Sequence, residues 1–162
     1  MGESRSPDGD EVVPGAGDKA RRGPVSATRR AALTAWTTRL RRASTVEEVG
    51  AELANCGIRI ARSSRSVFSF CDVVGVNVKS VDLKGQRGAA VSRYGSETIL
   101  IDSRIEGNDR EFVMAHELGH LLVYPAIVAG AVIDHTTEES ICDQFAALVT
   151  GISRPSVSPK PT

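Results

Sequence analysis

Hydrophobic residues recur at helical spacing where the apolar part of the chain begins. Leu33, Trp36 and Leu40 lie three or four positions apart, and arginines fall on the opposite face. This pattern predicts an amphipathic helix that starts near Thr28.

A second helix is expected in the stretch STVEEVGAELANCG. Thr45 and Glu48 have the spacing of a capping box, in which each side chain binds the backbone N–H group of the other residue. The apolar stripe of this helix consists of Val46, Val49 and Leu53. Gly57 suits its C-terminal end.

Three short runs rich in β-branched residues come next. They follow the stretch IRIARSSRSVFSFCDVVG, which fits either a strand or a helix. The runs are VNVKSVDL, GAAVSRYG and ETILIDS, and Gly, Ser and charged residues separate them. They predict an antiparallel meander of about three strands.

Two further helices complete the predicted domain. The stretch NDREFVMAHELGHLLVY is expected to be capped by Asn108 or Asp109 and to end before Pro125. The stretch TEESICDQFAALVTGI is expected to be capped by Thr136 or Thr137. Its apolar stripe consists of Ile141, Phe145, Leu148, Val149 and Ile152.

The composition of the chain changes at both ends. Residues 1–27 are rich in Gly, Pro, Ser and charge, and residues 153–162 have the same character. Such segments bury too little apolar surface to offset the entropy of ordering, so both are predicted to be disordered. Residues 28–152 are expected to form one α+β domain, with a small antiparallel sheet packed on helices.

The 162-residue chain carries 20 basic and 20 acidic side chains, so its net charge is zero and favours neither nucleic acid nor membrane as a partner. Arginine is dense from Arg21 to Arg65, but the run lacks a regular interleaving of aromatic residues. A solvated helix face is therefore preferred to a DNA-contacting arm, which stays the weaker alternative.

No signal-peptide core and no run of membrane-span length occurs in the sequence. Cys56, Cys71 and Cys142 form no CxxC pair. They are expected to be buried thiols of a protein in the reducing cytoplasm.

Two of the three histidines lie four residues apart in the stretch REFVMAHELGHLLVYP. On a helix, His116 and His120 project from the same face, so both imidazoles reach one tetrahedral zinc ion at about 2.0–2.1 Å. Glu117 lies about 100° around the helix, where it could accept a proton from a zinc-bound water. This is the H-E-x-x-H pattern of zinc peptidases.

A zinc site also needs a third protein ligand. The longer motif of one peptidase class would place Gly and His where this chain has Val123 and Ala126, so that class is excluded. His135, with its neighbour Asp134 in the same predicted loop, is one alternative.

The final helix offers the favoured alternative. Glu139 and Asp143 are one turn apart, so Glu139 could bind the ion while Asp143 accepts the free N–H group of a ligating histidine. Glu138 is interpreted as a first-turn acid favoured by the helix dipole.

The stretches ETILIDSRIEGNDREFVMAHELGHLLV and EESICDQFAALVTG resemble the ImmA/IrrE family of zinc metallopeptidases from Gly88 to Ile152. The resemblance implies a zincin-like metallopeptidase fold and one zinc ion bound by His116, His120 and Glu139. It assigns Glu117 as the general base. Cys142 and Asp143 stand where the family prefers Ala and Asn. Many members also continue beyond Ile152, so part of the substrate-binding surface is expected to be missing or to come from a partner.

By this resemblance the chain is expected to cleave a helix-turn-helix repressor in a stress or mobile-element circuit. In zinc peptidases generally, an edge strand pairs with the extended substrate, and TILID is expected to be that strand. Tyr94, Tyr124 and His135 are the candidate oxyanion stabilisers. The alternative function is a metal-containing binding or sensor module that grips a regulator without turnover.

Overall fold

The computed structural model describes residues 27–63, 66–93 and 96–153, with only the backbone described for 27–33. Apart from residues 27 and 153, the two segments predicted to be disordered lie outside these ranges. The elements are α1 (Ala27–Leu40), α2 (Val46–Ser63), α3 (Val67–Val74), β1 (Asn77–Val81), β2 (Gly88–Arg93), β3 (Ser96–Asp102), α4 (Gly107–Val128) and α5 (His135–Thr150). The predicted α+β class is confirmed.

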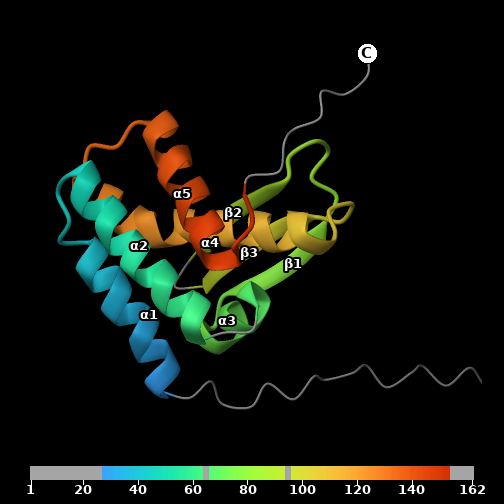
Figure 1. Cartoon of the computed structure of the whole chain (residues 1–162), viewed down its shortest axis with the longest axis horizontal. Coiled ribbons are helices and arrows are strands. Elements are labelled where there is room, and N and C mark those ends of the chain that lie inside the picture. Colours follow the sequence, from blue (N-terminus) through green and yellow to red (C-terminus); the bar gives the residue numbers. More distant parts are fainter. Residues whose placement is uncertain (1–26, 64–65, 94–95, 154–162) are drawn as a thin grey trace, which may run out of the picture.

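Helix α4 runs through the middle of the molecule (Figure 1). The strands lie along one side of it, and α5 crosses it on another side. The core is built around α4, whose buried side chains include Met114, Leu118 and Leu122. Burying such apolar side chains on a central helix fixes the position of every other element against it.

The three-stranded sheet has the order β1-β3-β2. Strand β1 is parallel to β3, whereas β2 is antiparallel to it, so the predicted antiparallel meander is wrong. Strand β3 is central because it is the most apolar of the three, with Ile99 and Ile101 fully buried. The strand pattern located each strand correctly but carried no information about its neighbours.

A buried carboxylate holds the connection between β1 and β2. Asp102 is 2% exposed and accepts hydrogen bonds from the Leu83 backbone N–H at 3.1 Å and from the Arg104 side chain at 2.7 Å. These bonds hold the pKa of Asp102 well below its usual range. The backbone N–H of Asp102 donates to the carbonyl of Arg87 at 2.9 Å, which fixes the path of the chain into β2.

Helix α2 begins at the predicted capping box but does not end at Gly57. The backbone N–H of Glu48 donates to Oγ1 of Thr45 at 3.2 Å, and the N–H of Thr45 to Oε2 of Glu48 at 3.4 Å. A Cβ atom at Gly57 would lie 2.9 Å from Cδ2 of Leu148 on α5. The glycine therefore allows two helices to pack closely. Of the ambiguous stretch after it, residues 58–63 form the end of α2 and residues 67–74 form α3.

Three predicted helix boundaries are wrong: the end and the cap of α4 and the cap of α5. Helix α4 continues through Pro125, because this proline lies near its end and removes only one backbone bond, and the N–H of Ala129 still donates to the Pro125 carbonyl at 3.1 Å. The residue before α4 is Glu106, which makes no capping bond with its side chain. The cap of α5 is Asp134, whose carboxylate accepts from the backbone N–H of Thr137 at 2.9 Å.

Candidate metal centre

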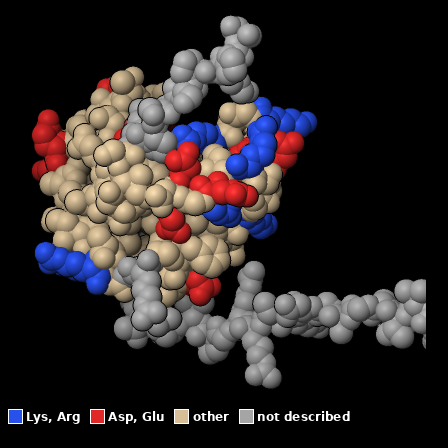
Figure 2. Space-filling view, turned by 45° about the vertical axis from the view of Figure 1, so that its right-hand side comes forward, with Lys and Arg blue, Asp and Glu red and all other residues tan. Residues whose placement is uncertain are grey.

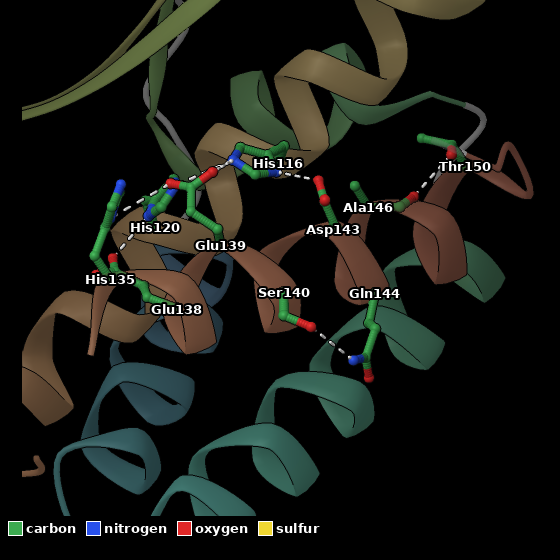
Figure 3. Close-up of polar contacts among 10 residues, drawn as sticks. All are labelled: His116, His120, His135, Glu138, Glu139, Ser140, Asp143, Gln144, Ala146 and Thr150. Carbon is green, nitrogen blue, oxygen red and sulfur yellow. Dashed lines mark hydrogen bonds and ion pairs between the residues drawn. The ribbon is translucent and has the colours of Figure 1, made fainter. Parts of the chain in front are cut away.

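Helices α4 and α5 bring three potential ligands together (Figure 3). The Nε2 atoms of His116 and His120 lie 3.1 Å apart. The Glu139 carboxylate reaches both rings, at 3.4 Å from Nε2 of His116 and 3.3 Å from Nε2 of His120. The candidate ligand atoms all lie within 4.8 Å of one another, so they face one common point.

The opposite nitrogen of each imidazole contacts a carboxylate. Nδ1 of His116 lies 2.9 Å from Oδ1 of Asp143, and Nδ1 of His120 lies 2.7 Å from Oε1 of Glu138. A carboxylate only accepts, so each Nδ1 is the donor in its contact, and in the neutral ring the Nε2 atom then keeps its lone pair. Burial, with the charge of the neighbouring His120, lowers the pKa of His116 and favours the neutral ring that a metal requires.

Sequence reasoning placed Asp143 beside a histidine but assigned Glu138 to the helix dipole alone. The structure adds the contact with His120. The spacing of Glu138 and Asp143 in the sequence is compatible with this second contact. Two acids five residues apart on one helix can face two histidines four residues apart on a helix packed against it.

The donor set fits a zinc ion. Two neutral imidazoles and one carboxylate form a His2Glu set, which is a common ligand set of catalytic zinc sites and leaves a fourth position open. The candidate ligands are partly exposed, with side-chain exposures of 14%, 19% and 36% for His116, His120 and Glu139. The geometry therefore combines preformed ligands with access from outside.

Glu117 lies beside these ligands rather than among them. It is 9% exposed and packs against β2. Burial raises its pKa to about 7; the nearby Glu139 charge also raises it, while the His120 charge and the Ala90 backbone N–H group lower it. A carboxyl group with such a pKa can both take up and release a proton near neutral pH.

The close approach of Glu117 to β2 depends on Gly88. A Cβ atom at Gly88 would lie 2.6 Å from Oε1 of Glu117 and 2.7 Å from Cγ1 of Val113. Both distances are shorter than van der Waals contact, so only glycine fits while these side chains stay in place. Sequence analysis missed this residue, because a glycine at the start of a strand has many other uses.

A cleft runs along β2 past the metal centre. One hollow has a volume of about 370 Å³ and contains the ligands with Gln86, Arg87, Gly88, Phe112 and Val113 in its walls. A neighbouring hollow is bounded by residues 90–93 of β2 and by Leu121, Tyr124 and Glu138. Glu117 and His120 line both hollows, which makes them parts of one groove.

The strand at this groove is β2, not the TILID segment. That segment belongs to β3, whose two edges are occupied by β1 and β2, so the expectation that it is an edge strand is wrong. Just before β2, the Arg87 carbonyl accepts a hydrogen bond from the Asp102 N–H group. Alternation along the antiparallel pair then directs the backbone groups of residues 88, 90 and 92 away from β3. Residues 88, 90 and 92 line the two hollows together with Glu117, so this edge of the sheet faces the site.

The other candidate residues that the structure describes lie at the margin of the site. His135 is 84% exposed, and its Nδ1 atom lies 3.8 Å from Oε1 of Glu139, outside the set of three mutually close ligands. Asp134 caps α5. Tyr124 lines the groove and is 54% exposed. Tyr94 lies outside the described residues.

Acidic and basic side chains lie next to one another on the face shown in Figure 2. Several of these basic and acidic side chains form ion pairs. Arg87 contacts Asp109 at 2.9 Å, and Arg104 contacts Asp82 at 3.8 Å as well as Asp102. Within the part of the chain that the structure describes, no helix has the length and apolar character needed to cross a membrane.

Residues 71–148 match the family model of the IrrE N-terminal-like domain, a peptidase family. The match begins in α3, ends in α5 and therefore includes the whole sheet and the three candidate ligands. No curated protein matches the chain. This match confirms the resemblance seen in the sequence: residues 71–148, just under half of the chain, are similar to the ImmA/IrrE family of metallopeptidases.

Proposed function

We propose that this protein is a zinc-dependent endopeptidase. The observation that carries the proposal is the convergence of two imidazole Nε2 atoms and the Glu139 carboxylate beside the buried Glu117 carboxyl group. His116, His120 and Glu139 would hold the ion. When bound, zinc supplies a Lewis acid that polarises a carbonyl group and lowers the pKa of water to about 7.

Glu117 is the general base in this proposal. It accepts one proton from the attacking water while the hydroxyl oxygen bonds to the carbonyl carbon of the substrate. It then donates that proton to the amide nitrogen, the C–N bond breaks, and a carboxylic acid and an amine leave. The pKa of about 7 suits both steps, because the same carboxyl group must gain and lose a proton at neutral pH.

An extended peptide fits the groove beside β2. The outward backbone groups of residues 88 and 92, with the carbonyl group of Ala90, offer hydrogen bonds to a substrate main chain, as in other cases of strand addition to a sheet edge. These bonds would place a peptide alongside Glu117 and the ligands. Side chains of the groove, including Val113 and Tyr124, would then contact the side chains of the substrate.

The proposed natural substrate is a DNA-binding repressor of the helix-turn-helix type, and the proposed site of cleavage is the cytoplasm. The family resemblance supports this choice, because it implies that the protein controls gene expression by cleaving a regulator. A small helix-turn-helix protein encoded next to this chain would be the first candidate to try.

The test is the variant Glu117→Gln, which keeps the size of the side chain but removes the base. We expect it to bind zinc as the wild type does and to leave a co-expressed candidate repressor intact, while the wild type cuts it. Glu47→Gln, at an exposed position in the first turn of α2, is the control and should cut normally.

Cleavage by Glu117→Gln at the wild-type rate would refute the enzymatic proposal. A wild type that binds both zinc and the repressor without cutting it would instead support the binding-module alternative.

A further inference from the structure

The first three turns of α5 present three acidic side chains to the two imidazoles of α4. Glu139 faces the Nε2 atoms, whereas Glu138 and Asp143 each contact one Nδ1 atom. Each ring therefore lies between two carboxylates (Figure 3). The contact between Glu138 and His120 is the shorter of the two Nδ1 contacts, at 2.7 Å.

These contacts lie in a partly enclosed environment. The side chains of His120 and Glu138 are 19% and 20% exposed, and those of His116 and Asp143 are 14% and 17% exposed. A charge-assisted hydrogen bond is stronger where water has limited access. By contrast Glu47, in the first turn of α2, is exposed. An acid can therefore interact with a helix dipole while it stays exposed to water. The partial burial of Glu138 against His120 indicates that this residue has a second role.

The role follows from the short distance between the two Nε2 atoms. At 3.1 Å, a proton on Nε2 of His120 could be donated to Nε2 of His116. The two imidazoles would then be hydrogen-bonded to each other, and neither Nε2 atom would have a lone pair available for a metal ion. A carboxylate at Nδ1 opposes this arrangement, because it holds the proton on the other side of the ring.

We propose that Glu138 is a positioning residue of the metal centre: by accepting the Nδ1–H bond of His120, it keeps Nε2 of that ring unprotonated and aimed at the ion. Asp143 does the same for His116. The site is then ready for zinc before zinc arrives. This inference rests on the proposed zinc centre and adds to it a residue that holds a ligand without touching the metal.

The experiment compares two variants of similar size. Glu138→Gln keeps an acceptor oxygen, whereas Glu138→Met has none, and all three residues are good helix formers. Zinc affinity is measured by competition with a chromophoric chelator at constant pH. We expect Glu138→Met to bind zinc about 10–100-fold more weakly than the wild type, with Glu138→Gln closer to the wild type.

A second measurement reports the ring directly. Long-range proton–nitrogen NMR spectra of the zinc-free protein distinguish a proton on Nδ1 from one on Nε2. The wild type should show His120 protonated on Nδ1, and Glu138→Met should shift the population toward Nε2. Glu47→Met is the matched control, since it removes a first-turn acid away from the site, and it should change neither the affinity nor the tautomer.

Wild-type zinc affinity in Glu138→Met would overturn the inference and leave the zinc centre standing. An equal loss in Glu47→Met would also overturn it, because the effect would then be general. A wild type that binds no zinc would overturn the proposed function itself. These results are distinguishable in one titration series.

Discussion

Gly88 and Glu117 lie so close that a methyl group on the glycine would come within 2.6 Å of Oε1 of the glutamate. The start of β2 thus forms the wall against which the proposed base rests. Because β2 also borders the groove, one backbone segment positions both the base and a peptide substrate.

The first prediction concerns this contact. Gly88→Ala should displace Glu117 or move β2 outward, and a displacement of about 1 Å at a catalytic group can reduce the rate about 100-fold. Cleavage of the candidate repressor should fall accordingly. Zinc affinity should stay close to that of the wild type, since the three atoms nearest the new methyl group belong to Glu117 and Val113 and not to the ligands. Cleavage by Gly88→Ala at the wild-type rate would show that β2 can shift enough to accept the methyl group without displacing Glu117.

The second prediction compares two glycines of α2. Gly57→Ala would bring a Cβ atom to 2.9 Å from Leu148, so it should lower the free energy of unfolding by about 1–3 kcal/mol. Gly50→Ala meets its nearest neighbour, Ile141, at 4.0 Å and should instead raise the free energy by about 0.5–1 kcal/mol through helix propensity. Urea unfolding of both variants measures the difference. Equal effects would contradict the close packing of α2 on α5.

The third prediction concerns acid stability. The pKa of Asp102 is lowered in the fold, chiefly by hydrogen bonds from Arg104, so the folded state favours the carboxylate. Its contribution is fully present above the unfolded pKa of about 3.9 and is lost as the pH falls below that value.

Asp102→Asn removes this titration. The free energy of unfolding of the wild type should therefore fall more steeply below about pH 4 than that of the variant. Denaturant unfolding at a series of pH values checks this. Parallel curves would mean that Asp102 does not couple folding to protonation.

The fourth prediction concerns metal binding and stability. Zinc that binds only the folded state stabilises it by about 2.7 kcal/mol at a free concentration 100-fold above Kd. Tm should therefore rise with zinc, and His116→Ala or Glu139→Gln should remove most of the rise. His135→Ala is the control and should retain it, because His135 lies outside the close set of ligands. Loss of the rise in His135→Ala would require a different ligand set.

The sequence by itself determined the features that depend on spacing within one element. His116 and His120 share a helix face because they are four residues apart, and Thr45 and Glu48 form a capping box for a similar reason. Glu139 was reached through a second spacing argument on α5 and through family resemblance. The positions of the three strands also followed from their local composition.

Only the tertiary structure decided which surfaces meet. It put β3 in the centre of the sheet, made β2 the edge strand that borders the groove and gave Glu138 a histidine partner. It also used Gly57 as a packing position rather than as a helix end. The pattern of hydrophobic and polar residues in a helix or strand predicts which of its faces is buried. The choice of neighbour depends on the complementary shape and burial of two elements together, which the pattern of either one does not contain.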